Sequence, residues 1–215
     1  MSKINRIKIG GFRRLLAVDL PVRPFMVLIG ANGVGKTSFL DAFAMLSASA
    51  SGNMNRILSQ FGGISNLLTR GKSDDLSFLV DMEVPGHQPL EYDLHLATKG
   101  AGYSISKEIL SQQRADFPQP FTHINSSDGD IRYYEIDAER LVRPDWEHNP
   151  LETSLAQVPK MFRQPEDLRR ILATATQYHA LDVGPRAPVK LPQPKTGNVT
   201  RFRRGRPGAV SVLSS

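Results

Sequence analysis

The stretch Gly30-Ala31-Asn32-Gly33-Val34-Gly35-Lys36-Thr37 fits the pattern G-x-x-x-x-G-K-[ST] of a phosphate-binding loop. Its glycines permit a tight turn that brings successive backbone N–H groups close to phosphate oxygens. The Lys36 ammonium suits the β- and γ-phosphates of a nucleotide, the Thr37 hydroxyl is a ligand for Mg²⁺, and Ser38 suits an α-phosphate oxygen. We therefore predict ATP and Mg²⁺ as cofactors, with Thr37 as the metal ligand. The predicted nucleotide-binding residues of the loop are Gly30, Ala31, Asn32, Gly33, Val34, Gly35, Lys36, Thr37 and Ser38.

The segments on either side of the loop have the composition that such a loop needs. The preceding run Phe25-Met26-Val27-Leu28-Ile29 is apolar throughout and of strand length, which predicts a central strand buried on both faces. The following residues predict a helix from Lys36 to about Ser49, with Phe39, Leu40, Phe43 and Leu46 on one packed face. Strand, loop and helix thus follow in the required order.

The rest of the chain predicts an α/β fold, with a P-loop NTPase core and an antiparallel β subdomain over about residues 74–136. Alternating apolar residues separated by Pro-Gly and Lys-Gly turns predict an antiparallel meander. The predicted strands are 3–9, 15–20, 76–84, 90–96, 103–109 and 131–136. The predicted helices are 53–60 and 165–178, the second packing through Leu168, Ile171, Leu172 and Ala175. Residues 1–195 would form one lobe and residues 196–215 a basic irregular tail.

The net charge of +6 is not a property of the predicted lobe. Asp182 is the last acidic residue, and seven of the 27 basic residues follow it, so residues 1–182 carry 20 basic and 21 acidic groups. The sequence contains no apolar run of membrane-spanning length, no signal-peptide pattern at its start and no cysteine. We therefore expect a cytoplasmic protein without a membrane partner.

Three features of the first fifty residues resemble one group of ATPases. An opening strand leads into Gly11-Phe12-Arg13, a short amphipathic strand precedes the loop, and the loop carries Asn32 and is followed by Leu40-Asp41-Ala42. These features are similar to the N-terminal part of RecF/SMC-type ATP-binding-cassette ATPases, in particular the stand-alone ATPases related to the RecF and OLD proteins. The resemblance covers residues 3–46 most closely.

The resemblance implies an ATPase head of two lobes, of which this chain would be the N-terminal lobe. It places Arg13 near the nucleotide phosphates, although a surface arginine on a turn would look the same in the sequence. It also implies dimerisation through the ATPase heads, with DNA as a further partner, in DNA repair, recombination or phage defence. Gln157 and Gln164 are the nearest matches to the glutamine that such heads use to position Mg²⁺ and the attacking water.

The carboxylates and the signature loop that ATP hydrolysis needs are not recognisable. The segment Leu76–Asp81 resembles a Walker B strand, but it falls inside the predicted meander and Met82 follows in place of a second acid. Ile136-Asp137 is a weaker match, and no Leu-Ser-x-Gly signature is present. The catalytic residues are therefore unknown. Both an ATPase lobe and a non-hydrolysing nucleotide- or DNA-binding module that needs a partner chain remain open, with a small-molecule kinase as a more distant alternative.

The tail has two competing interpretations. Related ATPases continue after a stretch like Leu191–Pro194 with an acidic segment, and codons for residues from Thr200 onward, read one nucleotide later, can encode such a segment. This favours a shift of the reading frame near Thr200 and a truncated lobe. The alternative is a nucleic-acid-binding arm, in which clustered arginines contact phosphates and Phe202 stacks on a base.

Overall fold

The structure is a computed structural model that describes residues 2–115, 117–157 and 163–175. The predicted tail at 196–215, the end of the predicted helix at 176–178 and the segment Leu191–Pro194 lie outside the described residues.

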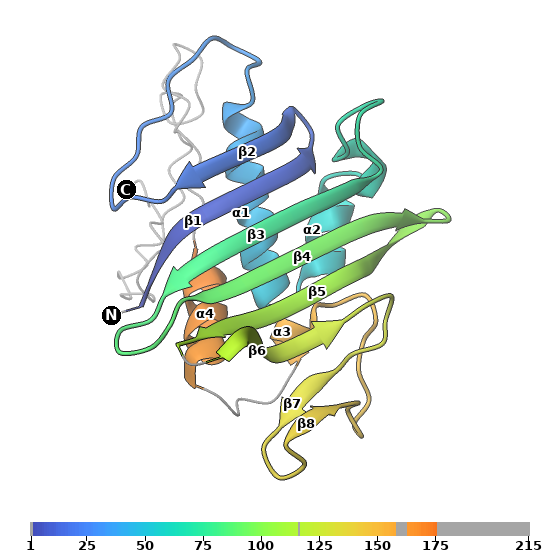
Figure 1. Ribbon diagram of the computed structural model, residues 1–215. Coiled ribbons are helices and arrows are strands. Elements are labelled where there is room, and N and C mark those ends of the chain that lie inside the picture. The colour runs from blue at the N-terminus through green and yellow to red at the C-terminus, as the bar shows by residue number, and fades with distance from the viewer. Residues whose placement is uncertain (1, 116, 158–162, 176–215) are drawn as a thin grey trace, which may run out of the picture. The chain divides into compact units, whose positions relative to one another are not determined.

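A single antiparallel sheet of eight strands dominates the described residues (Figure 1). The strand order is β2-β1-β3-β4-β5-β6-β7-β8, so every strand except β3 pairs with the strand that precedes it in the sequence. The first two strands belong to this sheet, because β1 pairs with β2 on one side and with β3 on the other. The strands are β1 Lys3–Phe12, β2 Leu15–Pro21, β3 Asp75–Glu83, β4 Leu90–Lys99, β5 Gly102–Arg114, β6 Phe117–Ser126, β7 Tyr133–Glu135 and β8 Arg140–Val142.

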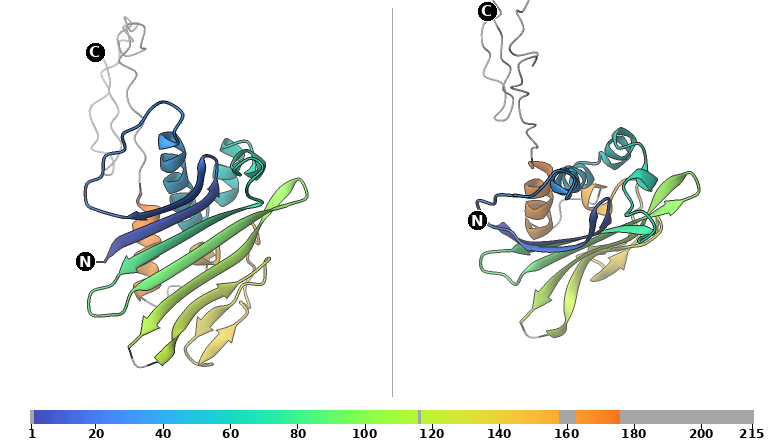
Figure 2. Two further views of the ribbon diagram at one scale, coloured as in Figure 1. Left: turned by 45° about the horizontal axis from the view of Figure 1, so that its top comes forward. Right: turned by 90° about the horizontal axis from the view of Figure 1, so that it is seen from above.

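Helices cover one face of this sheet, as the view along the sheet in Figure 2 shows. They are α1 Lys36–Ala50, α2 Met54–Gln60, α3 Ser154–Gln157 and α4 Arg163–Ala173, with a 3-10 turn, η1, at Ile64–Asn66. Period-two alternation of apolar residues fixes which face they cover. In β3, Leu76, Phe78, Val80 and Met82 are fully buried. They join a core with the inner side of α1, which contributes Ala42, Met45, Leu46 and Ala50.

The predicted central strand at Phe25–Ile29 is wrong. These residues form no strand, and the side chains of Phe25 and Ile29 are 82% and 91% exposed. A central strand needs neighbours on both sides for its backbone hydrogen bonds, whereas the described sheet ends at β2, with no strand paired beyond it. A P-loop core is usually built on a parallel sheet, whereas the described sheet is antiparallel throughout. The apolar run therefore has no sheet to enter within the described residues.

Most of the other predicted strands and helices are confirmed. The strands predicted at 3–9, 15–20, 76–84, 90–96, 103–109 and 131–136 correspond to β1 to β5 and β7, and the helices to α1, α2 and α4. Two predicted core positions are wrong, since Leu40 is 44% exposed on the outer face of α1 and Ala175 is exposed beyond the end of α4. Four elements were not predicted, namely β6, β8, α3 and the 3-10 turn η1.

Candidate functional site

The predicted phosphate-binding loop leads directly into α1. Gly35 is the residue before the helix and has φ = 113°, while Gly33 in the middle of the loop has φ = 82°. Both angles lie in the left-handed region, where a Cβ atom is disfavoured, so the two glycines are needed for this backbone path. The first helical hydrogen bond runs from the Phe39 N–H to the Gly35 carbonyl oxygen, 2.9 Å. The N–H groups before Phe39 therefore have no carbonyl partner within α1.

The charges at this helix N-terminus favour an anion. The first turn of α1 carries no acidic residue. Lys36 extends back over the loop, and its Nζ donates hydrogen bonds to the carbonyl oxygens of Gly30, 2.6 Å, and Ala31, 2.7 Å. The ammonium, the free N–H groups and the positive end of the helix dipole thus converge on one place.

The two hydroxyl groups that follow Lys36 differ in their exposure. Thr37 is exposed at the loop, where its hydroxyl fits a Mg²⁺ ligand beside bound phosphates. Ser38 is buried on the packed side of α1 and is only 7% exposed. The predicted contact of Ser38 with an α-phosphate oxygen stays a prediction, and of the two residues Thr37 is the better placed for a ligand.

Arg13 lies behind the loop and is engaged in a network of its own. It occupies the turn between β1 and β2 and forms an ion pair with Asp41 of α1. Its guanidinium carbon also lies 4.9 Å from the centre of the Phe61 ring. Asp41 follows Thr37 by four residues and therefore occupies the next turn on the same side of α1. The structure thus brings Arg13 to the region of the loop but holds its side chain against the helix.

The residues considered for hydrolysis are not brought to the loop. Asp81 on β3 lies between Val80 and Met82, which point into the core beneath the helices, so its carboxylate points to the opposite face of the sheet. Partial burial there raises its pKa. Asp137 lies in the exposed turn between β7 and β8. Five strand spacings separate β1 from β7, which corresponds to about 24 Å.

Neither candidate glutamine reaches the loop. Gln157 uses its amide to hold the segment before α3, donating to the carbonyl oxygens of Asn149 and Glu152. The neighbouring Thr153 donates to the carbonyl oxygen of Ser49, which places α3 at the far end of α1. Because α1 has 15 residues, that end lies about 21 Å from the loop. Gln164 lies beside His87 in the turn after β3.

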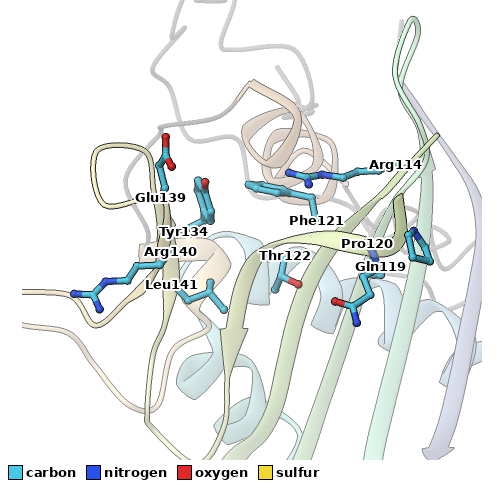
Figure 3. Close-up of a pocket in the computed structure, with 10 residues that line it drawn as sticks. Arg114, Gln119, Pro120, Phe121, Thr122, Tyr134, Glu139, Arg140 and Leu141 are labelled. Atoms are coloured by element: carbon cyan, nitrogen blue, oxygen red, sulfur yellow. The ribbon is translucent and has the colours of Figure 1, made fainter. Parts of the chain in front are cut away.

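A cavity of about 560 Å³ opens near the opposite edge of the sheet from β2, between β6 and β8 (Figure 3). Arg114 lies across the ring of Phe121, with its guanidinium carbon 4.8 Å from the ring centre, and Tyr134 packs edge-on against the same ring at 4.5 Å. The cavity shares no residue with the loop. It is therefore separate from the predicted phosphate-binding loop.

The chain matches a known family of ATPase domains. Residues 25–193 match the family described as "AAA domain, putative AbiEii toxin, Type IV TA system", and this range contains the whole loop. A comparison with curated proteins found no match. In the part of the chain that the structure describes, no helix is both long and apolar enough to cross a membrane. The family match covers well over half of the sequence and agrees with the loop geometry, so this chain belongs to the family of AbiEii toxin-like AAA domains, which are P-loop ATPase-like domains.

Proposed function

We propose that this chain is the ATP-binding lobe of an ATPase related to the RecF, SMC and OLD proteins. ATP would bind with its phosphates at the N-terminus of α1, held by the backbone of the loop from Gly30 to Gly35 and by Lys36. Mg²⁺ would be held by Thr37 and by the phosphates, with water completing its octahedral shell. Bound Mg²⁺ would offset the negative charge that builds up on the phosphate oxygens.

The observation that carries this proposal is the arrangement around Lys36. Its ammonium lies within the loop, bonded to two loop carbonyl oxygens, at a helix N-terminus that has no acidic residue in its first turn. Such a site attracts an anion strongly, because dipole, backbone donors and side-chain charge all have the same sign. The order of loop and helix is that of a nucleotide-binding P-loop.

Hydrolysis by this chain alone is not favoured by the positions of its carboxylates. Within the described residues, the acids that resemble a Walker B pair lie on the wrong face of the sheet or at its far edge. The exposed apolar segment Phe25–Ile29 further favours a second lobe that supplies neighbouring strands. The proposed module therefore binds nucleotide and depends on further polypeptide, from a second head or from a partner chain, to hydrolyse it.

The biological setting belongs to the proposal as well. Head dimerisation driven by ATP, with DNA as a partner, would place the protein in DNA repair, recombination or phage defence. The family description names a toxin of a type IV toxin–antitoxin system, which supports the defence branch of this proposal. The family match ends at residue 193, shortly before the proposed frame shift near Thr200.

A combined binding and turnover experiment separates the two forms of the proposal. Binding of MgATP is measured by calorimetry and phosphate release by a coupled assay, for the full chain and for the Lys36→Ala variant. Turnover that disappears in the variant would support an ATPase. Binding without turnover would support the module, and absence of binding would refute both.

A further inference from the structure

We infer that Arg14, rather than Arg13, is the arginine that contacts the phosphates of the bound nucleotide. This inference rests on the proposed function, because it concerns the same loop. It assigns to Arg13 a different part, that of a positioning residue for the turn that carries Arg14.

The turn between β1 and β2 packs directly against the phosphate-binding loop. Phe12 pairs with Leu15, so Arg13 and Arg14 are the two residues of a tight hairpin turn. A Cβ atom added to Gly35 would lie 3.5 Å from the Cβ of Arg14 and 3.3 Å from a methyl carbon of Leu15. The Cβ of Arg14 therefore borders the space that a side chain at Gly35, the last loop residue before α1, would occupy.

The backbone of this turn is strained and is held from several sides. Arg13 has φ = 50°, a left-handed conformation that is uncommon for a residue with a side chain. Its N–H donates to the carbonyl oxygen of Leu67, and the nearby Thr69 N–H donates to that of Gly11. Strain of this kind persists only where the surroundings determine the conformation, and it is frequent at ligand-binding sites.

Arg13 itself is not available to a phosphate without losing its partners. Its guanidinium is paired with Asp41 and lies over the Phe61 ring, and the Arg13 side chain is partly buried. The Asp41 carboxylate offsets the Arg13 charge, and its own side chain is only 11% exposed. The Arg13–Asp41 ion pair is therefore neutral overall and partly buried, and it links the hairpin turn to α1.

The side chain of Arg14, unlike that of Arg13, is exposed and forms no hydrogen bond or ion pair with any residue that the structure describes. Asp41, the acidic residue of α1, is already paired with Arg13, so the charges of Arg14 and Lys36 at this end of the helix are not offset by a carboxylate. A polyphosphate would supply the missing negative charge, and a guanidinium can donate two parallel hydrogen bonds to it.

The position beside Gly35 also indicates which phosphates are contacted. The backbone N–H groups of such a loop surround the α- and β-phosphates, while its lysine reaches the β- and γ-phosphates. Arg14 should therefore act on groups that ATP and ADP share. It should not act on adenosine.

The test compares nucleotide affinities of the full chain and its variants by calorimetry. We expect Arg14→Ala to weaken both ATP and ADP about ten-fold, the typical loss for one charge-assisted contact. Arg14→Lys should recover part of the affinity. Arg140→Ala, which removes an exposed arginine at the far edge of the sheet, is the matched control and should change neither affinity. The melting temperature of Arg14→Ala should equal that of the wild type, since the side chain has no hydrogen bond or ion pair to lose.

Arg13→Ala provides the second readout. Because Arg13→Ala removes the ion pair between the hairpin turn and α1, it should lower the melting temperature, whereas Arg14→Ala should not. Wild-type affinity of Arg14→Ala for ATP and ADP would overturn the inference. If Lys36→Ala also binds as the wild type does, the proposed function fails too; if Lys36→Ala has lost binding, the proposed function stands and only the role of Arg14 is refuted.

Discussion

The ammonium of Lys36 lies 2.6 Å from the carbonyl oxygen of Gly30, and this hydrogen bond links the last part of the loop to its first residue. The side chain is therefore already ordered at the place where a phosphate would bind. A phosphate oxygen would replace carbonyl oxygens as the acceptor, so binding would not have to order a freely moving lysine. Arranging a side chain beforehand in this way lowers the entropy cost of binding.

Gly35→Ala should weaken nucleotide binding about ten-fold. Gly35 has φ = 113°, where a Cβ atom costs about 1–2 kcal/mol, and the new methyl group would press on Leu15 at 3.3 Å. Relief of that contact would move the hairpin turn away from the loop. Gly100→Ala is the control, because Gly100 also has positive φ, 58°, but faces open space in a distant turn. ATP titrations in which both variants bind like the wild type would contradict the described loop geometry.

Glu108→Gln should destabilise the fold by about 1–3 kcal/mol. Glu108 is fully buried and accepts hydrogen bonds from the Tyr92 hydroxyl and from the N–H groups of Ser154 and Leu155. An amide would turn one acceptor into a donor that faces other donors. Urea unfolding measures the loss, and Glu91→Gln, an exposed glutamate on the neighbouring strand, serves as the control.

Glu108 also predicts a pH dependence. Burial raises the pKa of Glu108 above its ordinary value of 4.5. Between 4.5 and the raised pKa the folded state binds more protons than the unfolded state, so stability should fall as the pH rises through this interval and then level off. The Glu108→Gln variant should lack this fall. An equal slope in variant and wild type would assign the effect to another group.

His95 should give the fold a second pH dependence. Its Nε2 lies 3.1 Å from Asp93 and its Nδ1 lies 3.2 Å from Asp75, and these carboxylates raise the pKa of His95 above 6.5. The stabilisation should be complete below pH 6.5 and should be lost as the pH rises through the raised pKa. Melting temperatures of the wild type and His95→Gln should therefore converge towards high pH. Because the pair is partly exposed, added salt should reduce the difference. Parallel curves for the two proteins would refute the assignment.

Replacing exposed apolar residues before the loop should reduce association without loss of stability. Phe25 and Ile29 are almost completely exposed, and an apolar surface of this kind favours contacts with another chain. The double variant Phe25→Ser/Ile29→Ser should be less associated in light scattering and should melt at the wild-type temperature. Leu16→Ser, on β2, is a control for a single exposed leucine. A wild type that is already a monodisperse monomer would contradict this expectation.

The parts of the fold that the sequence predicted are those in which local pattern and tertiary surroundings agree. The alternation of Leu76, Phe78 and Val80 determined both the existence of β3 and the face that it buries. The strand β6 was missed because Pro118 and Pro120 interrupt its pattern, and proline lacks the N–H that a strand uses. The helix α3 has only four residues, too few to show a period.

The candidate site was predictable only in part, for a similar reason. The spacing from Gly30 to Thr37 identified the loop, because each of its residue types has a local function. The strand at Phe25–Ile29 was not formed, because a buried strand depends on neighbours that no local pattern supplies. Arg14 was not singled out, since only the packing of the hairpin turn on Gly35 distinguishes it from Arg13.

The most direct test of the central claim is an equilibrium titration of the full chain with MgATP, in parallel with Lys36→Ala and Lys99→Ala. Lys36 is the cation within the loop, while Lys99 is an exposed lysine at the end of β4. The account predicts saturable binding to the wild type and to Lys99→Ala, with an affinity at least ten-fold weaker for Lys36→Ala. Equal affinity of all three proteins for MgATP, or no binding to any of them, would contradict it.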